Sequence, residues 1–342
     1  QTEKEALEMT WKVLITDFVW PSTDPERKIL EEGGAEVIIA PNSEEETLIA
    51  LSHDVDAIMT CFANVSENII RSAPNCKVIG RFGVGVDNIA VDVATELGIA
   101  VTYVPDYCID EVSDHVIAMM HTWNRKIATF DKSVKERGWG HLGLNMRIMR
   151  LRNKTIGIVG FGRIGQAVAE KSKAFGLDIL VSDPVISQSF AADKGCKLVG
   201  MDELLKESDF VTLHAPLMDS TINLIGKKEL HLMKKDSFLI NAARGQLINE
   251  NDLLDALKTN TIGGAGLDVM ADNIPPIDHP FFSLDNILIT PHIAFFSQEA
   301  TIELEERAAG EVVRAYQGVM PENLVNKDVL HHPSPRHKLS RK

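Results

Sequence analysis

Residues 155–168 read TIGIVGFGRIGQAV. The TIGIV portion is apolar and rich in β-branched residues, which predicts a buried strand, and the QAVAEKSKAF that follows Gly165 predicts a helix. Between them lies the pattern G-x-G-x-x-G. Glycines punctuate many loops, so the pattern alone is weak evidence. With a strand before it and a helix after it, the pattern is typical of a turn that binds the phosphates of a dinucleotide.

The three glycines of this turn have separate physical roles. Gly160 allows the tight turn, Gly162 lets the backbone approach a pyrophosphate, and Gly165 lets the helix pack close to the strand. N–H groups at the start of the helix, around Arg163 and Ile164, have no partner within the helix. They can therefore hold phosphate oxygens.

An acidic residue follows the next apolar run. LDILVS (177–182) leads into Asp183, which lies eighteen residues past Gly165. A carboxylate there can accept hydrogen bonds from both hydroxyls of the adenosine ribose and would repel a 2′-phosphate, so NAD is favoured over NADP. The alternative is a structural turn followed by a capping Asp. The strand, glycines, helix and acid stand in the register of a dinucleotide site, which favours the first interpretation.

Short apolar runs alternate with helical patterns on both sides of this motif. The expected strands in the N-terminal part are 11–17, 35–40, 56–60, 76–80 and 99–104; those in the later part are 155–160, 177–182, 208–214, 236–243, 261–269 and 286–290. A helical stretch at 111–138 separates the two series, and an amphipathic helix at 297–318 follows them. The alternation predicts two consecutive α/β units with parallel sheets.

Length and composition limit the possible function classes. A chain of 342 residues suits two domains, and 44% hydrophobic with 25% charged residues is ordinary for a soluble globular protein. No run of eighteen apolar residues predicts a membrane span, and QTEKEALE at the start lacks the features of a signal peptide. The net charge of −14 argues against nucleic-acid binding. The basic end PRHKLSRK (335–342) is expected to be disordered.

The four cysteines are scattered without a C-x-x-C pair. They are expected to be buried thiols of a cytoplasmic protein, and neither disulfides nor a metal site is predicted for Cys61, Cys76, Cys108 and Cys196.

Polar residues that could carry chemistry follow several expected strands. Arg244 comes after NAA, Asp268 after the run ending in GL, and His292 after ILITP. Because ligands of open parallel sheets bind beyond the carboxyl ends of the strands, these side chains could converge on the nicotinamide end of a cofactor. Arginine can bind a carboxylate or carbonyl with two hydrogen bonds, and histidine can exchange a proton as a hydride moves.

A second glycine-rich loop, GRFGVGVDNI (80–89), follows a strand in the N-terminal half. The amides of Val84, Gly85 and Val86 could form a small anion-binding nest. A plain strand-to-helix turn explains the same residues equally well.

Taken together in order, the motifs GRFGVGVDNI, GIVGFGRIG with Asp183, LHAPL, NAARG, AGLDV and ILITPHIA cover roughly residues 10–325. With this set the sequence resembles the D-isomer-specific 2-hydroxyacid dehydrogenases. VPDYCIDEVSDH (104–115) and VLITDFVWP look most like the bacterial branch often called C-terminal-binding-protein-like dehydrogenases.

The resemblance implies two Rossmann-like domains, one flavodoxin-like and one NAD-binding, with parallel sheets and a cleft between them. The substrate domain would be discontinuous, comprising 10–108 and 297–325, with the NAD-binding domain at 109–296 and tails at 1–9 and 326–342. The family also implies a homodimer whose interface includes the Trp139 loop.

The resemblance also implies residue roles. Arg244 would bind the substrate carboxylate and carbonyl, His292 would be the acid–base, and Asp268 would contact the nicotinamide carboxamide. The amides of the Val84–Val86 loop would help to hold the substrate carboxylate. The remaining residues expected to line the cofactor site are His214, Ala215, Pro216 and Ala243.

One departure from the family pattern concerns the acid–base. The family usually has a Glu in D-V-x-x-x-E-P that pairs with the catalytic His, and here the corresponding residue is Asn273, followed by Ile274. Asp272 could replace the Glu after a one-residue loop shift. Alternatively, Asn273 orients His292 without raising its pKa, or catalysis is weakened or different.

The sequence therefore predicts an NAD-dependent oxidoreductase that interconverts a small D-2-hydroxy acid and its 2-keto acid. A dehydrogenase of an unusual hydride donor stays open as an alternative. So does a non-catalytic NAD-sensing protein related to the corepressors of the family, which Asn273 favours. The presence of both Arg244 and His292 argues against the sensor, since a pure binding module needs neither.

Overall fold

The computed structural model describes residues 11–140, 146–272 and 274–340. The chain divides into two compact units: unit 1 combines the residues up to Tyr107 with those from Ser297 onward, and unit 2 is continuous over Cys108–Phe296. Asn273 lies outside the described residues.

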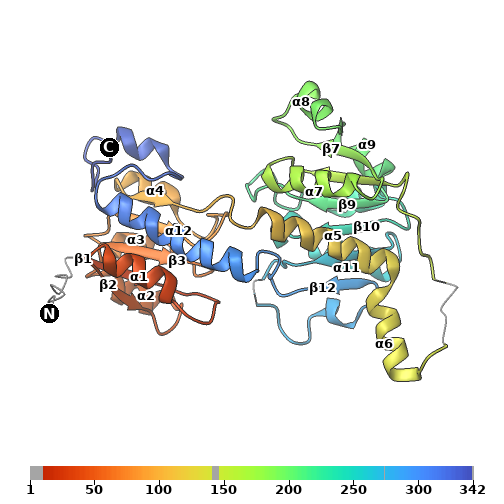
Figure 1. Ribbon diagram of the computed structural model, residues 1–342, viewed down its shortest axis with the longest axis horizontal. Coiled ribbons are helices and arrows are strands. Elements are labelled where there is room, and N and C mark those ends of the chain that lie inside the picture. Colours follow the sequence, from red (N-terminus) through yellow and green to blue (C-terminus); the bar gives the residue numbers. More distant parts are fainter. Residues whose placement is uncertain (1–10, 141–145, 273, 341–342) are drawn as a thin grey trace, which may run out of the picture. The chain divides into compact units, whose positions relative to one another are not determined.

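Unit 1 contains a five-stranded sheet with the order β2-β1-β3-β4-β5. Its strands β1, β2 and β3 are labelled in Figure 1. All four strand pairs are parallel. The strands are β1 (Trp11–Ile15), β2 (Ala35–Ile39), β3 (Ala57–Thr60), β4 (Val78–Arg81) and β5 (Ala100–Thr102). This is the order of flavodoxin-like folds, in which the chain reverses direction across the sheet between β1 and β3. The strands β3 and β4 are buried at every position, as expected for a parallel sheet covered on both faces.

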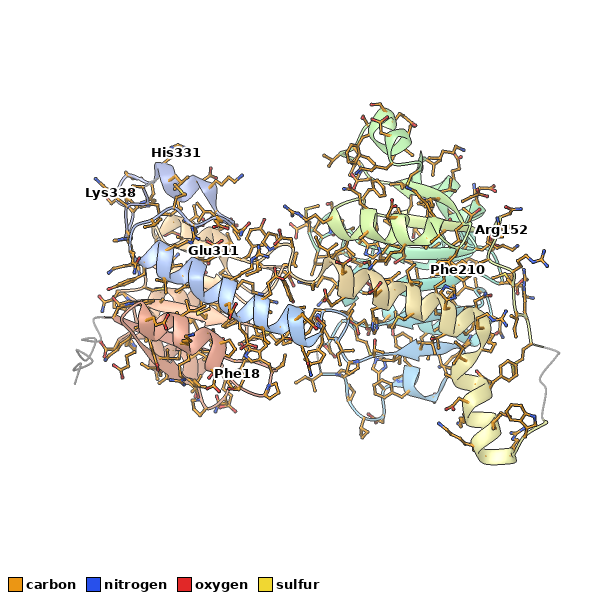
Figure 2. All side chains as sticks on the ribbon, in the orientation of Figure 1. Phe18, Arg152, Phe210, Glu311, His331 and Lys338 are labelled. Atoms are coloured by element: carbon orange, nitrogen blue, oxygen red, sulfur yellow. The ribbon has the colours of Figure 1, made fainter. Side chains whose placement is uncertain are left out.

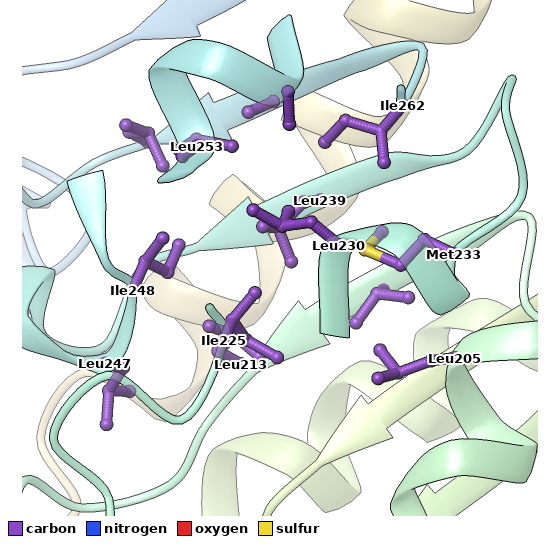
Figure 3. Packing of buried hydrophobic residues seen from close by; sticks show 14 of the residues in the cluster. Leu205, Leu213, Ile225, Leu230, Met233, Leu239, Leu247, Ile248, Leu253 and Ile262 are labelled. Carbon is purple, nitrogen blue, oxygen red and sulfur yellow. The ribbon is translucent and has the colours of Figure 1, made fainter. Parts of the chain in front are cut away.

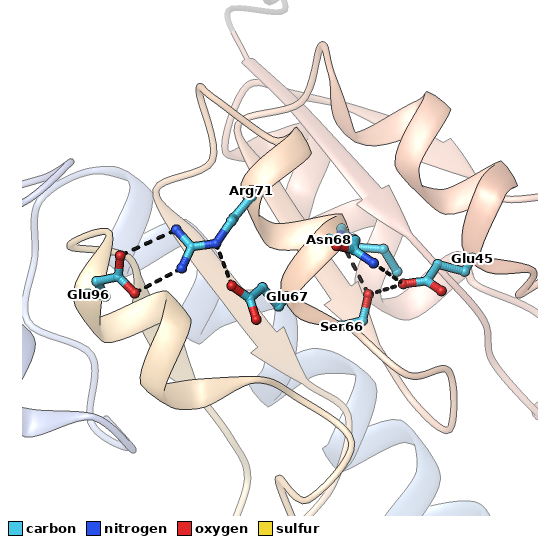
Figure 4. Close-up of polar contacts among 7 residues, drawn as sticks. Glu45, Ser66, Glu67, Asn68, Arg71 and Glu96 are labelled. Carbon is cyan, nitrogen blue, oxygen red and sulfur yellow. Dashed lines mark hydrogen bonds and ion pairs between the residues drawn. The ribbon is translucent and has the colours of Figure 1, made fainter.

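The helices of unit 1 follow the strands as the sequence predicts. They are α1 (Asp24–Glu32), α2 (Glu45–Ser52), α3 (Glu67–Ser72), α4 (Val91–Glu96) and α12 (Gln298–Tyr316), with a short 3₁₀ segment, η3, at Lys327–His331. At the surface, Arg71 of α3 donates to Glu67 in the same helix and, through two nitrogens, to Glu96 of α4 (Figure 4). Such exposed pairs contribute little to stability.

Helix α12 belongs to unit 1 although it follows unit 2 in the sequence. It packs on α1 and β4, and its apolar face is buried at Leu304, Ala308 and Val312. The contacts are close because two glycines face the helix. A Cβ on Gly33 would lie 2.9 Å from Val313 Cγ2, and one on Gly80 would lie 2.4 Å from Val312 Cγ2.

The C-terminal segment differs from the disordered tail that the sequence predicts at 335–342. Figure 2 shows Glu311 on α12 and His331 and Lys338 in the segment that follows. Arg336 donates to the carbonyl oxygens of Ala73 and Cys76, and Ser340 N donates to Gly318 O. Lysine and arginine suggested a solvated end, but these hydrogen bonds hold the described part of the segment on unit 1.

Unit 2 contains a seven-stranded sheet with the order β12-β11-β10-β9-β6-β7-β8. Its strands are β6 (Thr155–Val159), β7 (Asp178–Ser182), β8 (Lys197–Leu198), β9 (Phe210–Leu213), β10 (Phe238–Asn241), β11 (Gly264–Leu267) and β12 (Ile287–Ile289). All pairs are parallel. This is the doubly wound Rossmann order, which reverses between β6 and β9. Of these strands only β8, which has two residues, is not predicted by an apolar run in the sequence.

The helices of unit 2 cover both faces of its sheet and enclose apolar clusters, one of which appears in Figure 3. They are α5 (Ile109–Arg125), α6 (Ile127–Arg137), α7 (Arg163–Lys173), α8 (Gln188–Asp193), α9 (Met201–Glu207), α10 (Lys227–Leu232) and α11 (Glu250–Lys258), with 3₁₀ segments η1 (Gly245–Leu247) and η2 (Pro280–Ser283). Among the described helices, none combines the length and apolar character needed to cross a bilayer.

The helical stretch predicted at 111–138 is broken at one residue. Lys126 adopts a left-handed conformation with φ 55°, which ends α5 and begins α6. Its Nζ lies 3.3 Å from the ring centroid of Trp123, and burial lowers the pKa of this lysine. Periodicity alone could not predict the break, because Lys is an ordinary helix former. Here the left-handed conformation of Lys126 is accompanied by the contact of its ammonium group with Trp123.

Candidate active site

The turn after β6 has the geometry that phosphate binding requires. Gly162 is the N-cap of α7, has no side chain to cap the helix, and a Cβ added to it would meet nothing within 4 Å. By contrast, α3, α8, α11 and α12 are capped by side chains, those of Ser66, Ser187, Asn249 and Ser297. The first N–H groups of α7, including those of Arg163 and Ile164, are thus available to an anion.

The other two glycines of the turn are fixed by close backbone contacts. Gly160 has φ 88°, and a Cβ there would lie 2.7 Å from the amide nitrogen of Ala215. A Cβ on Gly165 would lie 2.4 Å from Gly160 O. Both positions therefore exclude any larger residue, and Gly160 brings the β6 loop against the loop after β9. This contact lies at the point where the strand order reverses, where such folds bind ligands.

Asp183 follows β7 and reaches back to the glycine turn. Its Oδ2 accepts from Phe161 N at 2.8 Å and its Oδ1 accepts from Val185 N at 2.8 Å. A carboxylate has about four acceptor positions, so acceptor capacity remains for ribose hydroxyls. The acid thus both shapes the turn and presents a negative charge beside it.

The loop after β9 carries His214, Ala215 and Pro216. Burial lowers the pKa of His214 to about 4, so its ring is neutral at pH 7. His214 Nε2 lies 3.0 Å from Thr212 Oγ1. Ala215 is buried and Pro216 is exposed. The arrangement fits a wall of a cofactor site and offers no proton for exchange near neutrality.

Arg244 follows β10 in a loop shaped by Asn241. The Asn241 amide accepts from Ala243 N at 3.0 Å and donates to Arg244 O at 2.8 Å, while Arg244 Nη1 donates to Ala243 O at 2.8 Å. Behind the arginine, a Cβ on Gly245 would lie 2.0 Å from Met270 C. The backbone of Arg244 is therefore held on both sides, and its half-buried side chain lies at the carboxyl edge of the sheet.

His292 follows β12 and has an unusual backbone. Its φ is 54°, in the left-handed region that few non-glycine residues adopt. Its amide donates to Asp268 O at 2.8 Å and to Thr290 O at 3.1 Å, and its ring centroid lies 6.3 Å from that of Phe295.

Asp268, after β11, is buried and organises this loop. Its carboxylate accepts from Thr290 Oγ1 at 2.6 Å, Ile293 N at 3.0 Å and Ala294 N at 2.9 Å. The role expected from the resemblance, contact with a nicotinamide carboxamide, stays a prediction. What the structure adds is that the same side chain shapes the turn of His292.

The segment next to the departure from the family pattern is anchored at Ala271. Its amide donates to Glu250 Oε1 at 2.7 Å and its carbonyl accepts from Gln246 Nε2 at 3.0 Å. Asp272 is exposed, while Asn273 lies outside the described residues. The choice between the two as the partner of His292 therefore stays open.

Unit 1 presents the second glycine-rich loop after β4. Gly83 has φ 147°, and its carbonyl accepts from Val104 N at 3.0 Å. In the described part of the chain, the amides of Val84, Gly85 and Val86 donate to no protein acceptor. Free amides in succession are what an anion-binding nest needs, but Val84 is exposed and water can serve such amides, so the nest stays a prediction beside the plain turn.

Two site-shaping residues were not singled out in the sequence. His115 of α5 places Nε2 2.9 Å from Thr290 Oγ1 and 3.7 Å from Asp268 Oδ1. Asp17, after β1, accepts from the amides of Cys61, Phe62 and Ala63. The motif VPDYCIDEVSDH contains His115, but only the fold brings it to β12. Asp17 carried no sequence signal beyond its place after a strand.

All four cysteines are buried free thiols, as predicted. Burial raises the pKa of Cys61 and of Cys76 to about 12, so neither is a nucleophile at neutral pH.

Comparison with known proteins identifies the family. The model of the D-isomer specific 2-hydroxyacid dehydrogenase, NAD binding domain, matches residues 117–294. D-3-phosphoglycerate dehydrogenase of Methanocaldococcus jannaschii is 39% identical over 92% of this chain and 59% of its own length. Glyoxylate reductase of Thermococcus litoralis is 38% identical over 83% of this chain and 87% of its own length. The chain thus spans about three fifths of the phosphoglycerate dehydrogenase it matches.

A solved structure gives the same result. D-lactate dehydrogenase of Aquifex aeolicus, complexed with NAD and lactic acid, superposes with a TM-score of 0.82 at 27% identity, covering 90% of this chain and 96% of the other. The chain belongs to the D-isomer-specific 2-hydroxyacid dehydrogenase family, and unit 2 contains the NAD-binding domain of that family. The fold and family predicted from the sequence are confirmed. The assignment to the C-terminal-binding-protein-like branch stays a prediction.

Proposed function

We propose that the protein is an NAD-dependent oxidoreductase that interconverts a small D-2-hydroxy acid and its 2-keto acid. One observation carries the proposal. The uncapped glycine turn after β6, Arg244 after β10 and the strained His292 after β12 all lie at the carboxyl edge of one parallel sheet. This is where an open α/β sheet binds its ligand. A turn suited to a dinucleotide, the guanidinium of Arg244 and the proton donor His292 therefore lie at the same edge.

In the proposed mechanism the protein's residues bind, orient and exchange a proton. The Arg244 guanidinium binds the carboxylate and polarises the carbonyl of the keto acid, and the amides of Val84, Gly85 and Val86 assist with the carboxylate. NADH bound at the glycine turn after β6 would supply the hydride that the carbonyl carbon accepts. His292 gives a proton to the carbonyl oxygen, and oxidation of the hydroxy acid is the reverse. Holding the reactants in a fixed geometry lowers the entropic part of the barrier.

The cofactor proposal is specific for NAD. The Asp183 carboxylate beside the turn would repel a 2′-phosphate, and its remaining acceptor positions suit ribose hydroxyls. The glycine turn fits the pyrophosphate of NAD. The space beside Gly162 is open, and Gly160 and Gly165 pack so closely on the backbone that no side chain fits at either position. We further propose that unit 1 is the substrate domain and unit 2 the NAD-binding domain of a homodimer.

The test is NADH absorbance with a panel of 2-keto acids that includes glyoxylate, hydroxypyruvate and branched or aromatic acids. Wild-type protein should turn over at least one of them, NADPH should be a poor substitute, and His292→Ala should abolish most of the turnover. A His292→Ala protein with unchanged turnover would show that His292 is not the acid–base. Tight NADH binding without any turnover would favour the NAD-sensing alternative or an unusual hydride donor.

The residue that replaces the family's Glu can be tested in the same assay. In Asn273→Glu a carboxylate near His292 would favour its protonated form, which carbonyl reduction requires. The pH profile of reduction should therefore extend to higher pH than in the wild type. An unchanged profile would indicate that position 273 does not face His292 and would favour Asp272 as its partner.

A further inference from the structure

The backbone of His292 is held in an unfavourable conformation. A left-handed non-glycine residue is unfavourable and persists only where its surroundings fix it. Asp268 supplies most of the hydrogen bonds that do so here, beside the bond from His292 N to Thr290 O. Asp268 accepts from His292 N with its carbonyl oxygen and from Ile293 N and Ala294 N with its carboxylate. Three successive amides therefore converge on Asp268, and its position determines the position of His292.

Asp268 is in turn held from outside its own loop. Its side chain is 1% exposed, so a buried carboxylate needs every donor it has. Thr290 Oγ1 lies 2.6 Å from Oδ1, the distance of a hydroxyl that donates to a charged oxygen. A hydroxyl has a single proton, so Thr290 must then accept from its other neighbour, which is His115 Nε2 at 2.9 Å. Nε2 of His115 must therefore carry a proton.

The hydrogen bonds form a directed chain from α5 to the acid–base loop. His115 donates to Thr290, Thr290 donates to Asp268, and Asp268 receives the amides that shape the turn at His292. Helix α5 also packs on α7, the helix of the dinucleotide turn, and on β10, the strand before Arg244. One rigid helix thus supports the three parts of the site in unit 2.

We infer that His115 and Thr290 are positioning residues that fix the turn of His292 through Asp268. The inference rests on the proposed function, in which His292 exchanges the proton. Replacing Thr290 by Val removes the donor to Asp268 and the acceptor of His115 while keeping the size of the side chain. The carboxylate then loses one of its three donors, and the amides of Ile293 and Ala294 are bound to an acceptor that is held less firmly. A shift of about 1 Å at a reacting group can lower the rate 100-fold.

The first experiment needs no activity. Amide hydrogen exchange of Ile293 and Ala294 is measured by NMR in wild type, Thr290→Val, Thr290→Ser and His115→Phe. We expect faster exchange in Thr290→Val and His115→Phe, and wild-type protection in Thr290→Ser, which restores the hydroxyl. The matched controls are Thr102→Val and His121→Phe. Thr102 is a buried threonine whose hydroxyl has no partner among the described residues, and His121 lies on α5 packed against Phe175.

Exchange that is unchanged in Thr290→Val would overturn the inference whatever the catalytic result. The same outcome would follow if Thr290→Ser behaved like Thr290→Val, since the hydroxyl would then not matter.

The second experiment is a double-mutant cycle, with the 2-keto acid that wild type reduces fastest. Thr290→Val should lower kcat roughly 10- to 100-fold, and the dissociation constant of NADH should change much less. In a His292→Ala background, Thr290→Val should change the residual rate by no more than about twofold, because positioning acts only through His292. An additive loss would contradict the inference. A His292→Ala protein with wild-type turnover would instead refute the proposed role of His292 as the acid–base, and the exchange result would still decide whether the network shapes the loop.

Discussion

Asp17 is the residue that joins two strands of unit 1 at the point where their order reverses. Its carboxylate accepts from the amides of Cys61, Phe62 and Ala63, at 2.6–3.1 Å, and from the hydroxyl of Thr16 at 2.9 Å. The loop after β3 therefore has its shape imposed by a charge at the end of β1. Ligands of flavodoxin-like folds bind at this crossing, so a fixed loop here would define one side of the substrate site.

We predict that Asp17→Asn loosens this loop. An amide offers one acceptor oxygen in place of two and turns a donor toward backbone N–H groups, which should cost about 2–3 kcal/mol of stability. The KM for the keto acid should rise more than the KM for NADH. The control is Asp56→Asn. Asp56 accepts from Lys12 N at the amino-terminal end of β1 and β3, the end away from the loop that Asp17 holds. Equal effects on both KM values would show that the loop does not serve the substrate.

A buried pair of carboxyl groups joins α1 to α12. Glu26 and Glu305 are 0% and 3% exposed, and their Oε2 atoms receive no donor from the described protein. Burial therefore raises the pKa of both carboxyl groups and favours their protonated forms. Burial, together with the neighbouring Glu26, raises the pKa of Glu305 to about 9. Trp20 Nε1 donates to Glu26 Oε1 at 3.2 Å.

The raised pKa has a direct consequence for stability. An unfolded Glu titrates near pH 4.3, so folding takes up a proton between that pH and about pH 9. The contribution of Glu305 is complete below about pH 4.3 and is lost as the pH rises toward 9. Glu305→Gln is neutral at every pH, so its free energy of unfolding should fall less steeply from pH 6 to pH 9. Urea titrations at several pH values would measure this; parallel curves for the two proteins would refute it. Glu299→Gln, at an exposed position of α12, is the control.

At the residue scale, the residues that could be predicted from the sequence are those that belong to a local motif. Gly160, Gly162 and Gly165 have the conformations and contacts their spacing implies. His115 and Asp17 were missed because their importance depends on partners 175 and more than 40 residues away, which no local pattern contains.

At the scale of elements, helix α6 contributes no residue to an apolar core. None of its residues is buried, and an isolated helix of eleven residues is only marginally stable in water. Ile127 and Val134 are exposed on it, and Trp139, just beyond its end, is 92% exposed. Exposed apolar side chains near one another in sequence are typical of an interface, which is consistent with the proposed homodimer.

We predict that Val134→Asp combined with Trp139→Asp weakens the dimer by about 2 kcal/mol or more, because buried aromatic anchors dominate interface energies. Sedimentation should then show monomers at concentrations where the wild type is dimeric. The control is Ile302→Asp, which places the same charge on an exposed apolar residue of α12. A dimer that survives the double substitution would exclude α6 from the interface.

Most elements were predictable because their apolar periods are long enough to recognise. The exceptions have physical reasons. β8 is too short for any period, and the α5–α6 break depends on one left-handed lysine. The C-terminal segment is polar and is held through backbone acceptors such as Ala73 O, which composition cannot reveal.

At the scale of the whole molecule, the two units differ in how the chain builds them. Unit 2 is continuous and has its own apolar clusters, so residues 108–296 produced alone should fold cooperatively and bind NADH. Unit 1 without residues 297–342 lacks α12 and should not fold. Circular dichroism and NADH fluorescence of the two fragments would check this. A fragment 108–296 that is unfolded would show that its core depends on unit 1.

The late position of α12 in the sequence has a consequence for how the protein is made. On a ribosome that adds about 5–20 residues per second, the five strands of unit 1 emerge roughly 10–40 seconds before the helix that covers them. Their contacts with α12 have a very high contact order, so they should form last. Until then the surface around Gly33 and Gly80 is exposed to other chains. Pulse-labelling hydrogen exchange during refolding should find β6 and β9 protected before β4. The opposite order would mean that α12 docks on unit 1 before unit 2 has folded.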